Sequence, residues 1–459
     1  MDGDEKRRKP SMTKLTTRPF ERNLRMARLG FGTGAKIAAH SFSNLFRDAD
    51  GRVDADRIFY AREAQVLADE LGQLKGSIMK AGQMLSLYGQ YFLPPEAVDV
   101  LSSLQDDTPA VAWPVVAPVL ERGLGKQRLA ELEVDERPLA AASLGQAHRA
   151  RRRSDGAELV LKIQYPGVGD AIESDVNTLS RVIGMTRLAP RGLDLNSIFA
   201  EVREMLHREV DYVAERRFTE DFGERLADDE RYVVPKIYRE FCSDQVLATS
   251  FEPGEGARAK AVQALPQSVR NELALNFLDL FLIEFFDWGM VQTDPHFGNY
   301  RIRQEAGHPR IVLLDFGATR VFGRGFVDGY RSIVAGALAR DAARIIDGAR
   351  AIGLMDDAFP QNVVSAFVDL CELIVEPFRE PHDAGDGQQW FNAQGAYRWA
   401  ESDLLKRVTS RASRNALSRY FRVPPREIVF LHRRLAGAFI MAATLGAEVS
   451  ARERLLARL

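Results

Sequence analysis

The sequence predicts an α+β fold of two lobes, and three observations lead to that prediction. An early segment repeats apolar residues with the 3.6-residue period of an amphipathic helix, at Leu67, Leu71, Leu74 and Ile78. A later segment, Glu158–Gln164, alternates its two faces as a strand does, and it follows an Asp155-Gly156 turn that fits a β-hairpin. The sequence EPGEG at 252–256 then supplies the Pro and Gly residues of a hinge-like connector between two lobes.

The order of such patterns divides the chain into five expected parts. Helix is predicted for two short segments within 96–135, for about 170–226, for the buried stretch 273–290, and from Phe326 onward except in PHDAGDGQQW. Strands are predicted over 245–251 and 311–314. The five parts are a basic N-terminal arm (1–50), a helical extension (51–135), an N-lobe (136–250), a C-lobe core (251–345) and a helical C-terminal region (346–459).

Composition places the chain among ordinary globular proteins. Of its 459 residues, 46% are hydrophobic and 27% are charged, and the formal net charge is −2. That charge gives no whole-chain attraction for nucleic acid, which we do not expect as a partner. The two cysteines, Cys242 and Cys371, lie far apart and form no CxxC pair, so they predict packing roles in a reducing compartment.

No transmembrane segment is expected. The most apolar stretch, 273–290, carries Asp279, Glu284 and Asp287, which are costly in hydrocarbon. The uncharged stretch 435–447 is shorter than the roughly 20 residues that a helix needs to cross a bilayer. The N-terminus lacks the apolar centre of a signal peptide, so the expected location is cytoplasmic, with peripheral contact to the inner membrane as an option.

The N-terminal arm is the part that favours such contact. Through Arg28 it holds nine Lys/Arg against four Asp/Glu, followed by apolar residues on one helical face. It fits a helix lying on anionic lipid, and it fits a solvated basic arm docked on the body; the second interpretation is favoured.

Three oxygen-bearing side chains carry the chemistry. QTDPHFGNY holds Asp294 and, five positions later, Asn299, on a turn that Pro295 and Gly298 keep from being helix. Asp315, in LLDFG, follows after a strand-like segment and a second turn, so a β-hairpin would bring the three together. Asn299 and Asp315 are then candidate ligands for Mg²⁺, which prefers oxygen ligands and phosphate. Asp294 would orient a hydroxyl or a water toward the terminal phosphate of ATP, as the catalytic-loop Asp does in kinases.

An upstream lysine is the expected phosphate contact. Lys162, in LVLK, matches the lysine of the kinase V-A-I-K strand, while its neighbours Leu161 and Ile163 line the opposite face. The segment EVDYVAE offers it Glu209, Asp211 and Glu215 as acidic partners, and Glu215 is preferred. A solvated acidic stripe remains the alternative for these three residues.

The nucleotide loop is expected in AAASLGQA, at 140–147. It can be aligned with the kinase Gly-rich pattern so that Ala140 and Ala142 take the places of the first two glycines and Gly145 that of the third. Alanine restricts positive φ angles, so this loop would be stiffer and would change how the nucleotide is oriented.

Taken in order, these segments resemble the UbiB family of atypical, kinase-like proteins, which includes AarF-type bacterial members. The resemblance covers roughly residues 60 to 447. It rests on KAGQ, AAASLGQAH, DGAELVLKIQYPGV, EVDYVAE, QTDPHFGN, LLDFG and PPREIVFLHRRLAGA.

The resemblance implies a protein-kinase-like fold with an N-terminal helical extension, and MgATP between its two lobes. It also implies that Lys80 and Gln83 belong to the active site, on a helix that covers the place of a protein substrate. An atypical kinase or ATPase supporting isoprenoid-quinone or related lipid metabolism follows, with an isoprenoid lipid or small-molecule acceptor. A nucleotide-switched scaffold of a membrane-associated complex and a small-molecule kinase are the alternatives, and the oligomeric state is left open.

Two departures from the family pattern concern the nucleotide. Phe297 stands where many relatives carry Pro, and the hinge strand reads ATSFEPG, with Thr249 and Ser250 in place of a larger hydrophobe and an acid. These departures put the affinity for adenine in doubt. The resemblance does not extend to the membrane-spanning C-terminal segments of some relatives.

Overall fold

The structure is a computed structural model, and it describes residues 80–82, 84, 110–186, 195–305, 308–416 and 425–459. The N-terminal arm, most of the expected helical extension and Gln83 lie outside these residues. The chain forms two compact units. The first unit comprises the residues up to Arg216 together with the later segment Ile237–Phe251. The second unit comprises Arg217–Lys236 and Glu252–Leu459.

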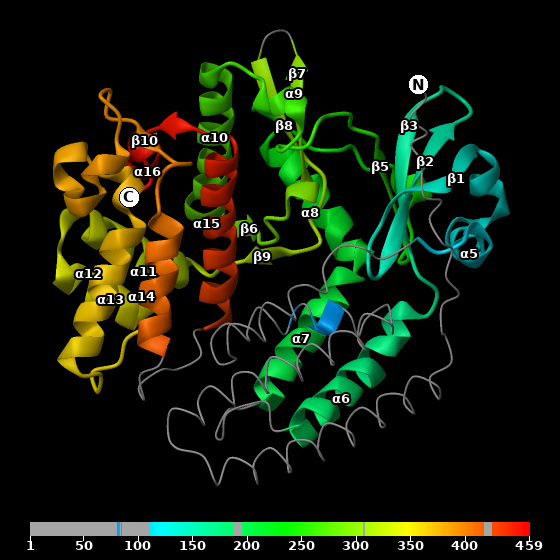
Figure 1. The fold of residues 1–459 in the computed structure, drawn as a ribbon. Coiled ribbons are helices and arrows are strands. Elements are labelled where there is room, and N and C mark those ends of the chain that lie inside the picture. The colour runs from blue at the N-terminus through cyan, green and yellow to red at the C-terminus, as the bar shows by residue number, and fades with distance from the viewer. Residues whose placement is uncertain (1–79, 83, 85–109, 187–194, 306–307, 417–424) are drawn as a thin grey trace, which may run out of the picture. The chain divides into compact units, whose positions relative to one another are not determined.

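The first unit contains a four-stranded antiparallel sheet (Figure 1). Its order is β1-β2-β3-β5, with bounds Leu132–Ala141, Gly145–Arg152, Glu158–Gln164 and Val246–Ser250. The turn before β3 uses Gly156 at φ 74°, a conformation that glycine adopts without strain. Leu159, Leu161 and Ile163 are fully buried while Lys162 on the other face is partly exposed, so the predicted alternation is confirmed.

The helices of this unit differ from the prediction at its beginning. Two short helices were expected within 96–135. Among the described residues of that range, α5 (Trp113–Ala130) is one helix with a kink at Gly125, and β1 begins directly after it at Leu132. The strand-rich segment therefore starts at Leu132, earlier than its sequence texture indicated. Helices α6 (Val168–Thr186), α7 (Leu195–Glu209) and α8 (Tyr212–Arg225) occupy the predicted helical stretch, and α8 from Arg217 onward belongs to the second unit. The short helix η1 (Arg239–Phe241) precedes β5.

The second unit holds two small sheets. Strand β8 (His308–Leu313) pairs antiparallel with β7 (Tyr300–Glu305) and parallel with β4 (Tyr232–Val233). Strand β6 (Met290–Gln292) pairs antiparallel with β9 (Thr319–Val321). The predicted hairpin is therefore present, because β7 and β8 are its two arms.

Helices make up the rest of this unit. The buried apolar stretch forms α10 (Gln267–Leu282) and continues as one π-helical turn, η2 (Ile283–Asp287). The other helices are α9 (Lys260–Gln263), η3 (Phe297–Asn299), α11 (Arg324–Ala339), α12 (Ala342–Ala351), α13 (Gln361–Ile374), η4 (Glu376–Phe378), η5 (Pro381–Asp383), η6 (Gly385–Trp390), α14 (Leu404–Ala416), α15 (Arg426–Thr444) and α16 (Arg452–Leu456).

The C-terminal region is not entirely helical outside its loop, and this corrects the prediction. Strands β10 (Tyr397–Arg398) and β11 (Glu448–Val449) pair antiparallel, and PHDAGDGQQW forms the short 3₁₀ turns η5 and η6. These strands are two residues each, too short to show a period of two in the sequence.

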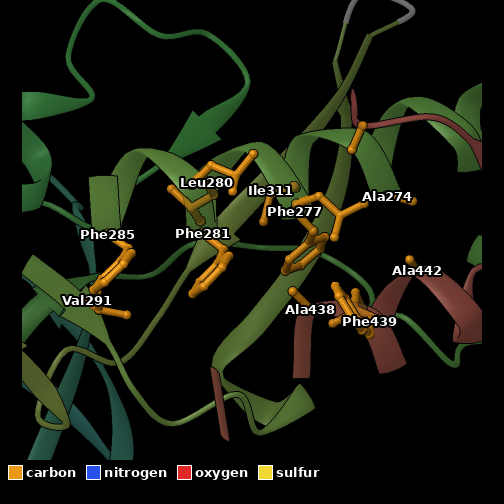
Figure 2. Close-up of a cluster of buried hydrophobic side chains, with 14 of the residues drawn as sticks. Ala274, Phe277, Leu280, Phe281, Phe285, Val291, Ile311, Ala438, Phe439 and Ala442 are labelled. Carbon is orange, nitrogen blue, oxygen red and sulfur yellow. The ribbon is translucent and has the colours of Figure 1, made fainter. Parts of the chain in front are cut away.

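The core of the second unit lies between α10 and α15 (Figure 2). Ala274, Phe277 and Phe281 from α10 point toward small and aromatic residues of α15, among them Ala438 and Phe439. Burial of this many apolar side chains is the main force that fixes α15 on the unit.

In the described residues, the structure contains no helix long and apolar enough to span a membrane. Cys242 and Cys371 are free cysteines.

Candidate functional site

The segment QTDPHFGNY leaves β6 and crosses to β7 as a loop. Thr293 anchors its start, because its backbone N–H and its hydroxyl both donate to the Ala318 carbonyl, at 3.2 and 2.7 Å. Pro295 then prevents the chain from continuing with regular backbone bonds. His296 closes the next turn, as its Nδ1 accepts from the Gly298 N–H at 3.0 Å. The loop is therefore held by hydrogen bonds to Ala318 and by a hydrogen bond within itself.

This loop brings two of the predicted site residues together. The Asn299 amide nitrogen donates to the Asp294 carboxylate Oδ2 at 3.0 Å and to the Asp294 backbone carbonyl at 3.2 Å. Since the nitrogen of Asn299 is used in this way, its amide oxygen is the atom left for a cation. Asp294 and Asn299 are both partly exposed.

Asp315 is tied to the same loop through the backbone. It follows β8, and the Leu314 N–H donates to the Asn299 carbonyl at 2.9 Å. The Asp315 carboxylate Oδ1 accepts from the Gly317 N–H at 3.0 Å, and Phe316 packs against Phe222. The hairpin thus fixes where the Asp-Phe-Gly turn begins relative to Asn299.

The buried phenol of Tyr300 is affected by the charges of both Asp294 and Asp315. Burial raises the pKa of Tyr300 to about 12, the Arg434 charge opposes this, and the negative charges of Asp294 and Asp315 add to it. Both carboxylates therefore act electrostatically on one buried side chain. In the part of the chain that the structure describes, no group of three or more His, Cys, Asp or Glu residues gathers as a metal site.

In the first unit the structure contains the expected ion pair of Lys162. Its Nζ lies 2.5 Å from Glu215 Oε1, and Glu215 is only 5% exposed. Strand β3 holds Lys162 between Ala147 of β2 and Leu247 of β5. The preference for Glu215 among the three acids is confirmed as a contact, while a role of this pair toward nucleotide stays a prediction.

The segment EVDYVAE is a junction between two helices and not one helix. Helix α7 ends at Glu209, and Asp211 caps α8, because its Oδ1 accepts from the Ala214 N–H at 2.9 Å. Glu209 and Glu215 therefore lie on different helices. Glu209 pairs with Lys80, whose Nζ is 2.7 Å from Glu209 Oε1.

The Ala-rich loop is tighter than the sequence suggested. Ala140 lies within β1 and pairs with Ala147, and the Ala142 N–H donates to the Gly145 carbonyl at 2.8 Å. A Cβ at Gly145 would stand 2.6 Å from the Ile163 carbonyl, so glycine is required there by close contact with β3. Whether these residues bind nucleotide stays a prediction.

Sequence reasoning missed the partner of Asp294. Arg433 of α15 donates through Nη2 to Asp294 Oδ1 at 2.6 Å, across 139 positions of sequence. Beside it, Arg434 pairs with Glu284 at 3.2 Å, and both side chains are almost fully buried. Burial raises the pKa of Glu284, and the Arg434 guanidinium opposes that rise. The available sequence signal was two adjacent arginines in the middle of a mostly apolar helix.

The comparisons define the class of protein. The chain shares its fold with a solved protein, Rv3197 of Mycobacterium tuberculosis, determined with erythromycin: the TM-score is 0.57 at 22% identity, over 88% of this chain and 97% of that one. The model of the ABC1 atypical kinase-like domain matches residues 103–349. The fold is therefore the α+β fold of protein-kinase-like proteins.

The chain belongs to the ABC1 atypical kinase-like, or UbiB, family. It is 30% identical to atypical kinase COQ8B, mitochondrial, of Rattus norvegicus, over 93% of this chain and 76% of that protein. It is 28% identical to atypical kinase COQ8, mitochondrial, of Saccharomyces cerevisiae, over 97% and 86%. For atypical kinase coq-8, mitochondrial, of Caenorhabditis elegans, the identity is 30% over 91% of this chain but only 54% of the relative.

Proposed function

We propose that this protein binds MgATP and transfers its terminal phosphoryl group to a lipid or small-molecule acceptor, or to water. Membership of the atypical-kinase family supports the general chemistry. The observation that carries the assignment to particular residues is the hydrogen bond from Asn299 to Asp294, together with the backbone bond that ties Asn299 to the residue before Asp315.

In this proposal the residues of each unit have separate tasks. Lys162, held by Glu215, contacts the α- and β-phosphates, and the loop from Ala140 through Ala142 to Gly145 lies along the nucleotide. The oxygens of Asn299 and Asp315 hold Mg²⁺, which neutralises charge on the phosphates when it is bound. The nucleotide would lie between the two lobes, as it does in protein kinases.

Asp294 would orient the acceptor. Each of its carboxylate oxygens accepts one hydrogen bond in the structure, from Arg433 and from Asn299. A carboxylate offers about four acceptor positions, so positions remain for an acceptor hydroxyl or a water. Its task is then to place the attacking oxygen in line with the terminal phosphate.

For the acceptor we propose an isoprenoid lipid, or a metabolite of isoprenoid-quinone synthesis, at a membrane surface. The support is the family resemblance, with Lys80 placed in the segment that covers a peptide substrate in that family. The ion pair of Lys80 with Glu209 ties Lys80 to the C-terminal end of α7.

Purified protein with MgATP tests the proposal. Slow phosphate release is expected, and Asp294→Asn should reduce it at least about 100-fold while MgATP still binds. Asp328→Asn, which changes a carboxylate on α11 paired only locally with Arg331, is the matched control and should turn over like the parent.

A panel of isoprenoid lipids and small hydroxyl compounds then identifies the acceptor by stimulated turnover. Equal turnover in Asp294→Asn and in the parent would end the catalytic proposal. Tight MgATP binding without turnover in the parent would favour the nucleotide-switched scaffold. Stoichiometric phosphorylation of a soluble metabolite would favour the small-molecule kinase.

A further inference from the structure

Helix α15 holds the loop of Asp294 from one side. Arg433 donates to Asp294 at 2.6 Å, and Gly437, one helical turn later, lies against Pro295. A Cβ at Gly437 would be 2.0 Å from the Pro295 Cβ, so only glycine allows the helix to approach this closely. Two consecutive residues of the loop therefore contact the same face of α15.

Three other contacts keep the helix in place. Arg434 pairs with Glu284 of η2, and the two side chains are only 1% and 2% exposed. The Arg320 guanidinium of β9 lies 3.4 Å from the centre of the Phe430 ring. Ala438 and Ala442 pack into the core against α10 (Figure 2). The backbone that carries Arg433 is thus anchored on both sides of that residue.

The Asp294 carboxylate is consequently held at both oxygens. Oδ1 receives the charged bond from Arg433, and Oδ2 receives the amide bond from Asn299. A carboxylate with one partner can rotate about its terminal torsion, which is broad for Asp, whereas two partners on different elements fix its plane. The direction of the remaining acceptor positions is then set by α15.

We propose that Arg433 is a positioning residue of the phosphoryl-transfer site, acting through Asp294. The inference rests on the proposed function and extends it to the C-terminal helix, which lies outside residues 103–349 matched by the family model. Arg433 does not touch the nucleotide in this proposal; it keeps the Asp294 carboxylate in the plane that orients the acceptor oxygen.

The test compares Arg433→Met and Arg433→Lys with the parent. Because Arg433 is 34% exposed, its replacement should leave the protein folded, with a melting temperature within about 3 °C of the parent. Arg433→Met should lower kcat about 10- to 100-fold with KM and Kd for MgATP within about twofold, since misplacement of a reacting group affects the chemical step. Arg433→Lys should recover part of kcat, and added guanidinium should partly rescue Arg433→Met.

Arg426→Met is the matched control, because it removes an exposed arginine from the first turn of the same helix, about two turns before Arg433, where it pairs with Glu427. Hydrogen exchange gives a readout that needs no turnover. In nucleotide-free protein, amides of residues 294–299 should exchange faster in Arg433→Met and unchanged in Arg426→Met.

The outcomes separate the two proposals. If Asp294→Asn abolishes turnover while Arg433→Met keeps kcat within twofold, the positioning role is wrong and the proposed function stands. Higher kcat in Arg433→Met would also overturn it, because the contact would then be inhibitory. A parent with no turnover overturns the proposed function and this inference with it.

Discussion

Gly437→Ala tests the close approach of α15 to the Asp294 loop. The added methyl carbon would stand 2.0 Å from the Pro295 Cβ and 2.6 Å from its Cγ. Both are far inside van der Waals contact, and the proline ring has no free torsion by which to move away. The helix or the loop must therefore shift.

The magnitude follows from two opposing effects. Overpacking of a buried contact costs about 1–3 kcal/mol, and the rigid neighbour places this site toward the upper end. Alanine is more favourable than glycine inside a helix by about 1 kcal/mol. The free energy of unfolding of the second unit should then fall by about 2 kcal/mol, which lowers the melting temperature of a unit of this size by about 4–8 °C.

Tryptophan fluorescence during thermal unfolding is a suitable assay, because Trp288, Trp390 and Trp399 all belong to the second unit. Gly325→Ala on α11 is the matched control: its Cβ would meet nothing within 4 Å, so it should be neutral or slightly stabilising. If Gly437→Ala is as stable as the parent, the packing of α15 on Pro295 is refuted. A stable Gly437→Ala would also remove one support for the role of Arg433.

Three further predictions concern the two units separately. Glu215→Gln removes the buried partner of Lys162, so MgATP affinity measured by calorimetry should fall about tenfold or more. Asn299→Ala removes the amide that we propose as a Mg²⁺ ligand, so the Mg²⁺ concentration for half-maximal turnover should rise about tenfold or more. Burial lowers the pKa of His432 to about 4. The neutral imidazole therefore stabilises the fold fully above about pH 6.5. This stability is lost as the pH falls toward 4, at a cost of about 3 kcal/mol that His432→Gln should abolish in denaturant titrations.

Each of these has its own control or contrary result. Glu240→Gln, at an exposed pair with Arg152, should leave MgATP affinity unchanged. If Asn299→Ala needs the same Mg²⁺ concentration as the parent, Asn299 is not a ligand of the metal. Equal loss of stability between pH 6.5 and 4 in His432→Gln and in the parent would assign the acid sensitivity to other groups.

Local patterns were enough to predict the strand of Lys162 and the hairpin that ends at Asp315. Glu158–Gln164 alternates and Ile311–Leu313 is an unbroken apolar run, and both signals depend on neighbours in sequence. Strand β1 was missed at its start because most of its residues are exposed, so no apolar face marks it. Pro138, where its register shifts, further weakens the strand pattern.

The junction at Asp211 shows a different failure. The acidic residues Glu209, Asp211 and Glu215 have the spacing of one helical stripe. Asp is also a preferred N-cap residue, because its carboxylate can accept a hydrogen bond from the backbone N–H three residues later. The structure uses Asp211 as that cap. Periodicity alone could not choose between one continuous helix and two helices joined at Asp211, because the composition of the chain does not change at this point.

Arg433 could not be found from sequence because its partner lies 139 residues away. Its position makes sense beside Arg434. Adjacent helical residues point about 100° apart, so two arginines in a row bind partners on different sides of one helix: Arg434 reaches the buried Glu284 and Arg433 reaches Asp294. A buried ion pair adds little stability compared with apolar residues of similar size, but it tolerates only one alignment of its two partners. The Arg434 pair thereby fixes the rotation of α15 about its own axis, and that rotation decides whether Arg433 meets the Asp294 carboxylate.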